Sequence, residues 1–151
     1  MDDCIFCKIV EGKIDSAKIW EDGEFVSILD INPNTRGMTL VLPKRHSDLD
    51  IFEMGDEEYA KLMEASKKTV SVLKKGLGVN KVAMVMEGMG VNHAHIKLYP
   101  LHGVGKEFKE TWADGKIFFE KYEGYISTLL GPKADISELK KLADGIKRRN
   151  G

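Results

Sequence analysis

The chain has 151 residues and a mass of 16.9 kDa, and 42% of its residues are hydrophobic. A chain of this length folds as one compact domain that buries about 70% of its unfolded surface, which excludes a disordered tail. The 23 basic and 24 acidic residues leave a net charge of −1, so no field attracts nucleic acid non-specifically. Any phosphate must therefore be bound by a local site.

The sequence gives no sign of a membrane span or a secretion signal. Its apolar stretches are far shorter than the ~20 residues of a membrane helix, and residues 1–4 lack the basic and apolar regions of a signal peptide. We therefore expect a cytoplasmic protein with no membrane partner. In a reducing compartment, the pair Cys4-x-x-Cys7 indicates half of a metal site or a redox couple.

The residue pattern predicts two pairs of strands separated by one long helix. Residues 24–30 and 38–43 indicate a hairpin, because a turn containing proline and glycine joins two apolar runs. Helical spacing of apolar residues then predicts a helix from Asp56, as its N-cap, to Gly76. Residues 81–86 and 93–99 predict a second antiparallel pair.

The C-terminal part of the chain carries weaker signals. Residues 117–130 are apolar and aromatic without a clear period, and residues 135–149 predict a helix. Gly131-Pro132 indicates a boundary between the core and a terminal appendage. The order of elements favours an α+β fold with an antiparallel sheet, one long helix and a C-terminal helical extension. We expect a single domain, residues 1–151, with a core over about 1–103 and an extension over about 104–151.

Histidines are concentrated around the last predicted strand, where three of the four lie within ten residues. A period of two places His93, His95, Lys97 and Tyr99 on one face of that strand. Polar residues on an amphipathic strand often only face water. Two imidazoles and an ammonium in a line, however, are donors suited to phosphate, so we interpret this face as a binding site. His102, just beyond the strand, fits a further donor or a surface histidine equally well.

These residues resemble a known family. The segment Val91-Asn-His-Ala-His-Ile-Lys-Leu-Tyr-Pro100 resembles the signature of histidine-triad (HIT) proteins, in which histidines alternate with apolar residues on a strand. Residues 4–9, 29–31 and 37–46 resemble the Hint-like branch of that family, in the same order. The resemblance covers residues 1 to about 103 and implies a HIT-like fold and a homodimer.

The resemblance also implies a nucleotide hydrolase or nucleotidyl transferase acting on a purine nucleoside phosphate derivative. His95 would attack the phosphorus, with His93 and Lys97 as the other catalytic residues, and water or another acceptor would resolve the nucleotidyl-histidine. A neutral imidazole is a competent nucleophile near pH 7, and a two-step displacement is ordinary covalent catalysis.

The sequence departs from the family signature at several positions. Lys97 takes the place of the third histidine, while Met86, Met89 and Gly90 replace polar residues. Lys97 can donate to a phosphoryl oxygen, and its charge disfavours protonation of His95. We therefore expect altered rather than abolished chemistry. The alternative is a nucleotide-binding sensor or interaction module that has lost catalysis.

A nucleoside pocket is implied by the same resemblance. Ile5 and Phe6 would sandwich the base, and Asp30 would accept from the ribose hydroxyls. Gly88 and Gly90 would let backbone N–H groups approach the phosphate closely. Taken without the resemblance, these residues fit core positions, a turn cap and a tight turn just as well.

Cys4 and Cys7 have the spacing of half a tetrahedral zinc site. The resemblance implies that His46 and His93 complete it. Such a closed site would be structural, tying the N-terminus to the signature strand and so aiming His95. We expect no organic cofactor. A redox dithiol and incidental thiols are the other interpretations of the cysteine pair.

A third functional hypothesis is a catalytic metal site built from His93, His95 and His102. It leaves both cysteines and His46 without a role, and Lys97 would repel a cation on the same face.

Aromatic residues in the C-terminal part could cover the mouth of the pocket, contact a dimer partner or fill the core. They are Trp112, Phe118, Phe119, Tyr122 and Tyr125.

Overall fold

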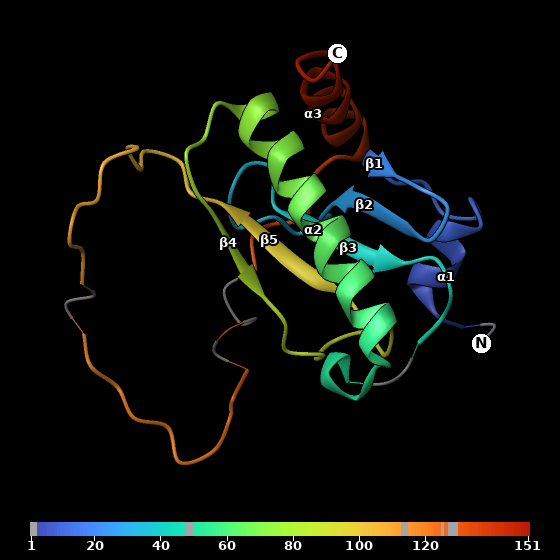
Figure 1. Cartoon of the computed structure of the whole chain (residues 1–151), viewed down its shortest axis with the longest axis horizontal. Helices are drawn as coiled ribbons and strands as arrows, with labels where there is room; N and C mark the ends of the chain where they lie inside the picture. The colour runs from blue at the N-terminus through green and yellow to red at the C-terminus, as the bar shows by residue number, and fades with distance from the viewer. Residues whose placement is uncertain (1–2, 48–49, 113–114, 125, 127–129) are drawn as a thin grey trace.

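The computed structural model describes residues 3–47, 50–112, 115–124, 126 and 130–151. Within these residues the chain forms the expected α+β fold, with a five-stranded antiparallel sheet in the order β1-β2-β3-β5-β4 (Figure 1). The strands are β1 (Lys18–Glu21), β2 (Phe25–Leu29), β3 (Thr39–Pro43), β4 (Val82–Val85) and β5 (Ile96–Pro100). The helices are α1 (Ile5–Val10), α2 (Asp56–Leu77) and α3 (Ile136–Arg148), with a 3₁₀ turn η1 (Ile51–Glu53) before α2.

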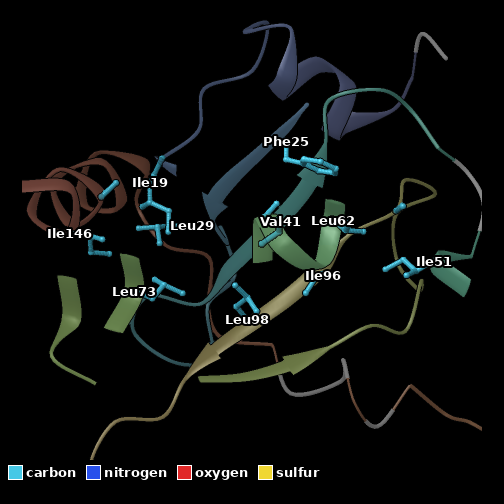
Figure 2. Packing of buried hydrophobic residues seen from close by; sticks show 14 of the residues in the cluster. Ile19, Phe25, Leu29, Val41, Ile51, Leu62, Leu73, Ile96, Leu98 and Ile146 are labelled. Carbon is cyan, nitrogen blue, oxygen red and sulfur yellow. The ribbon is translucent and has the colours of Figure 1, made fainter. Parts of the chain in front are cut away.

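The central strands β2 and β3 are buried on both faces of the sheet. Because side chains alternate along a strand, Phe25 and Leu29 of β2 enter the main core beneath α2 and α3, where Figure 2 places them near Val41. Val26 and Ile28 enter a second cluster with residues of α1. The sheet is therefore a middle layer, with α2 and α3 on one face and α1 on the other.

Both predicted strand pairs are confirmed, as the hairpin of β2 and β3 and the pair of β4 and β5. The short strand β1 was missed by the sequence analysis. β5 begins at Ile96 rather than His93, because the backbone N–H of Ala94 donates to the carbonyl of Ser47 instead of joining the sheet. His93 and His95 thus lie in the segment that leads into the strand.

The predicted long helix is confirmed, but the prediction of its ends is corrected. Gly55 rather than Asp56 is the N-cap, and the helix continues past Gly76 to a left-handed C-cap at Gly78, with φ +69°. Gly76 lies within α2 at its contact with α3. A Cβ there would lie 2.5 Å from Cγ2 of Ile146, so this glycine permits the close approach of the two helices.

The predicted C-terminal helix is confirmed as α3. Its N-cap, Asp135, accepts hydrogen bonds from the backbone N–H groups of Ser137 and Glu138. Leu139, Ala143 and Ile146 are buried in the main core. The helix beyond Gly131-Pro132 is therefore packed into the core, and the expectation of an appendage is wrong there.

Residues 105–112 and 115–120, between β5 and α3, lie away from the sheet on the side of β4 (Figure 1). Phe108, Trp112 and Phe118 are 86%, 80% and 87% exposed. Packing in the core, one of three roles considered for the aromatic residues, is therefore wrong for Trp112 and Phe118, while Tyr125 lies outside the described residues. Across the described residues, no helix combines the length and the apolar character that a membrane crossing requires.

Candidate functional site

A cavity of about 780 Å³ lies on the face of the sheet covered by α1. Its apolar lining includes Phe6 and Ile9 of α1 together with Ile28 of β2 and Leu40 of β3. These side chains belong to the second hydrophobic cluster, which the cavity therefore continues. A large, mainly apolar cavity with a few polar groups is the usual form of a small-molecule site.

The structure brings most of the predicted site residues to this cavity. Ile5 and Phe6 line it from α1, Asp30 from the end of β2, and Gly90 from the turn after β4. His95 and Lys97 line it as well. Gly88, which was also predicted for the site, is not among the described lining residues, whereas its neighbour Met89 is. Met86 instead packs against the main core.

His95 is held in one tautomer by a backbone hydrogen bond. Its Nδ1 lies 2.7 Å from the carbonyl oxygen of His93. Because a carbonyl only accepts, Nδ1 carries the proton and Nε2 carries the lone pair. His95 is 3% exposed. Burial foremost, with a smaller contribution from the charge of Lys97, holds its pKa below the ordinary histidine value. The side chain is therefore a neutral imidazole in the cavity wall.

Lys97 forms a buried ion pair that the sequence analysis did not anticipate. Its Nζ lies 2.7 Å from Oε1 of Glu87, and the two side chains are 10% and 6% exposed. The hydroxyl of Tyr122 hydrogen-bonds the other carboxylate oxygen of Glu87. The structure pairs Val85 of β4 with Lys97 of β5, which brings Glu87, two residues after Val85, close to Lys97. No residue pattern in the sequence signals this contact.

The four residues predicted to hold zinc, one of which is His93, lie together in the structure. Within the described residues they form the single group able to hold a metal, with ligand atoms all within 4.8 Å of one another. Nδ1 of His93 is 3.5 Å from Sγ of Cys4, 3.6 Å from Sγ of Cys7 and 3.3 Å from Nδ1 of His46. Ordinary tetrahedral zinc bonds separate sulfur and nitrogen ligands by about 3.6 Å, and two nitrogen ligands by about 3.3 Å. The donor set and its spacing fit zinc.

The neighbouring contacts support a metal ligand at His93. Its Nε2–H donates to the carbonyl of Pro43 over 2.9 Å, which leaves the Nδ1 lone pair toward the cysteines. Burial foremost lowers the pKa of His93, keeping the ring neutral. Burial foremost, and the adjacent Cys4, raise the pKa of the Cys7 thiol. Two histidine nitrogens lie among the sulfur atoms, which a metal site requires and a redox dithiol does not. The site favours metal binding over the dithiol interpretation.

The contacts of two other predicted residues show whether they belong to the cavity. His102 hydrogen-bonds through Nε2 to the carbonyl of Arg36 and is exposed, away from the cavity lining described above. The catalytic metal site of three histidines is therefore not assembled. Asp30 lines the cavity and also accepts from the backbone N–H of Asn32 at 2.7 Å, so the turn-cap and cavity roles coexist.

The C-terminal segment before α3 forms a wall of the same cavity. Leu130, Lys133 and Ala134 are among its lining residues. Backbone N–H groups of Gly131 and Ala134 donate to the carbonyls of Asn32 and Ile31, over 3.3 and 2.7 Å. No motif in the sequence pointed to this wall, because backbone hydrogen bonds carry no residue signature.

The comparisons with known proteins agree with this geometry. Residues 11–104 match the HIT domain, which is more than half of the chain, and the chain therefore belongs to the HIT family. It is 42% identical over 102 residues to an uncharacterized HIT-like protein of Methanocaldococcus jannaschii, covering 64% of this chain and 78% of that protein.

Two further relatives carry informative names. The chain is 31% identical over 107 residues to the adenosine 5′-monophosphoramidase of Schizosaccharomyces pombe, covering 71% of this chain and 77% of the relative. The crystal structure of a zinc-bound histidine triad family protein from Mycobacterium smegmatis superposes with a TM-score of 0.64 at 25% identity, covering 99% of this chain and 96% of that one. The HIT-like fold expected from the sequence is confirmed.

Proposed function

We propose that this protein is a Hint-like nucleotide hydrolase or nucleotidyl transferase with His95 as the nucleophile. The observation that carries the proposal is the hydrogen bond between Nδ1 of His95 and the carbonyl of His93, 2.7 Å long, in the wall of the large cavity. It leaves the lone pair on Nε2, the nitrogen that would attack a substrate bound in the cavity. A neutral, oriented imidazole is what nucleophilic catalysis at phosphorus requires.

The reaction has two balanced steps. Nε2 of His95 attacks the α-phosphorus of a bound nucleoside phosphate derivative, and the bond to the leaving group breaks. The leaving group takes the electron pair of that bond and a proton from solvent. Water then attacks the phosphorus and the P–N bond returns its electrons to His95, releasing a nucleoside monophosphate and one proton. An acceptor other than water would make the second step a transfer.

The substrate class follows from the cavity and from the fission yeast relative, which is named an adenosine 5′-monophosphoramidase. Ile5 and Phe6 would contact the base from α1, and Asp30 would accept from the ribose hydroxyls. Lys97 would bind the phosphate, beside the backbone N–H groups near Gly88 and Gly90. We therefore propose a purine nucleoside phosphoramidate or a related phosphate derivative as substrate.

Zinc would be held by Cys4, Cys7, His46 and His93 in a closed, structural site. When bound, it would supply a crosslink between α1, the end of β3 and the segment that carries His95. His93 would then be both a metal ligand and, through its carbonyl, the acceptor that orients His95. The zinc-bound neighbour supports this proposal.

A homodimer in the cytoplasm stays a prediction of the family resemblance. The exposed aromatic residues of the segment after β5, such as Trp112 and Phe118, offer apolar surface for a second copy. The sensor alternative is favoured by Met89 at the cavity wall, where the family pattern has a polar residue.

Trapping of the intermediate tests the function. The wild-type protein is incubated with adenosine 5′-phosphoramidate, quenched, and searched by mass spectrometry for an adenylyl group on His95. We expect the adduct and release of AMP, and a loss of about 10³-fold or more in His95→Asn, because an asparagine amide cannot act as the nucleophile. His102→Asn is the matched control and should stay active. Binding of AMP without adduct or turnover would instead establish the sensor alternative.

The ribose contact has its own test. Asp30→Asn should weaken AMP binding about tenfold, since a charged acceptor is replaced by a neutral one. Calorimetry with a 2′,3′-dideoxy analogue is the control, because the substitution should leave its affinity unchanged. Equal losses for both ligands would remove Asp30 from the ribose site.

A further inference from the structure

The buried pair of Lys97 and Glu87 differs from ordinary surface ion pairs of this protein. Both side chains are nearly withdrawn from water, and their charged atoms lie 2.7 Å apart. An unpaired ammonium at such a position would be strongly unfavourable, so the carboxylate compensates it. Both carboxylate oxygens are engaged, one by Lys97 and the other by Tyr122.

Only one member of the pair lines the cavity. Lys97 belongs to the cavity wall together with His95, whereas Glu87 is absent from its described lining. A ligand in the cavity therefore meets the ammonium, and the carboxylate contacts the site through its ion pair with Lys97. Tyr122 lies in the segment between β5 and α3, earlier in the chain than the residues of that segment that line the cavity directly, and it contacts Lys97 through Glu87.

We propose that Glu87 and Tyr122 are positioning residues that hold the Lys97 ammonium beside His95, so that the segment between β5 and α3 completes the reaction site. The inference rests on the proposed function, in which Lys97 binds the transferred phosphoryl group. Glu87 is an ionised acceptor at both oxygens, and the Tyr122 hydroxyl donates to it. The arrangement fixes the ammonium in one place before a substrate binds, which reduces the cost of ordering it in the transition state.

Glu87 should affect binding and catalysis in opposite directions. Its negative charge competes with a phosphate for Lys97, so Glu87→Gln should tighten AMP binding about fivefold. The freed ammonium is no longer oriented toward the transition state, so the rate of adduct formation should fall about tenfold or more. If the ion pair served only folding, breaking it would weaken AMP binding and also slow adduct formation.

The experiment measures AMP affinity by calorimetry and single-turnover adduct formation with adenosine 5′-phosphoramidate. Glu87→Asp, which keeps the charge, should retain wild-type affinity and regain part of the rate. In a Lys97→Met background, Glu87→Gln should change neither quantity by more than about twofold, because the residue acts through Lys97. If Glu87→Gln instead slowed adduct formation by the same factor with and without Lys97, the inference would be overturned.

Tyr122→Phe tests the contribution of the segment with little risk to folding, because Tyr122 is 41% exposed. We expect a loss of about threefold in the adduct-forming rate and an unchanged melting temperature. Tyr59→Phe on α2 and Glu123→Gln in the same segment are matched controls and should behave as wild type. Unchanged kinetics in Tyr122→Phe would show that Tyr122 does not help to position Lys97.

Failure of this inference and failure of the proposed function give different results. An active wild type whose Glu87→Gln variant matches it in rate and affinity overturns the inference and leaves the function intact. A wild type that binds AMP without forming an adduct overturns the function. In that case a tighter affinity in Glu87→Gln and a weaker one in Lys97→Met would still support the pairing, and no change would overturn it.

Discussion

The two ends of the chain close the same cavity by different physical means. At the N-terminal end, Ile5 and Phe6 line it from α1. Cys4, the N-cap of this helix, and Cys7, in its first turn, belong to the candidate zinc site. At the C-terminal end, Leu130 and the residues before α3 line it. They are placed by two backbone hydrogen bonds and by the docking of α3 in the core.

The difference shows which kind of contact can be recognised from an amino-acid sequence. Zinc is held by few residue types, so the spacing of Cys4 and Cys7, together with the family resemblance, pointed to the N-terminal wall. Backbone hydrogen bonds and apolar packing can form with many different residue types, so the C-terminal wall could not be predicted from the sequence. Each wall can be released separately, and the three variants below run from the largest expected effect to the smallest.

Releasing the N-terminal wall should have the largest effect. We expect Cys4→Ser to lose zinc and to lower the free energy of unfolding by on the order of 5 kcal/mol, with a matching loss of turnover, because α1 and His93 lose their crosslink. Thermal unfolding with and without a chelator, together with metal analysis, provides the measurement. Wild-type protein whose melting temperature does not respond to the chelator would contradict a structural zinc.

Loosening α3 should have an intermediate effect. Leu139 is 6% exposed in the main core, so Leu139→Ala should lower the free energy of unfolding by about 2–5 kcal/mol. Denaturant unfolding measures it, with Lys141→Ala on the exposed face of the same helix as control. Similar midpoints for both variants would mean that residues 136–148 are an appendage after all.

Disturbing the C-terminal wall alone should have the smallest effect on stability. Gly131 has no room for a side chain, since a Cβ would lie 1.8 Å from the carbonyl oxygen of Pro33. Gly131→Ala should therefore lower the free energy of unfolding by about 1–3 kcal/mol and weaken AMP binding, because the wall must shift. Gly105→Ala, with open space around the added Cβ, is the control. AMP affinity equal to that of the wild type would separate this wall from the binding site.

Local patterns were enough for much of the fold. The hairpin of β2 and β3, the helix α2 and the pair of β4 and β5 each carry a strong periodic or turn signal, and each is present. The role of Gly76 was misjudged, because glycine near a helix end predicts a cap. The structure instead uses it for contact with Ile146, a residue 70 positions later. Sequence proximity could not reveal that contact.

Some residues of the candidate site could likewise be predicted from the sequence and others could not. Cys4, Cys7, His46 and His93 were named from residue types and from a family resemblance, and the structure brings all four together. Glu87, however, was not among the residues predicted for the site. Its ion pair with Lys97 depends on the register of β4 against β5 and on burial, neither of which the residue types specify.

The amino-acid sequence by itself predicted most of the secondary structure and half of a candidate metal site, and its resemblance to a family added His46, His93 and the role proposed for His95. Periodicity, turn chemistry and ligand identity are local properties, readable over a few residues. The tertiary structure alone decided the tautomer of His95, the partner of Lys97 and the C-terminal wall of the cavity. Those features arise when distant segments bury polar groups together, and each buried group must then find a partner at the position where packing places it.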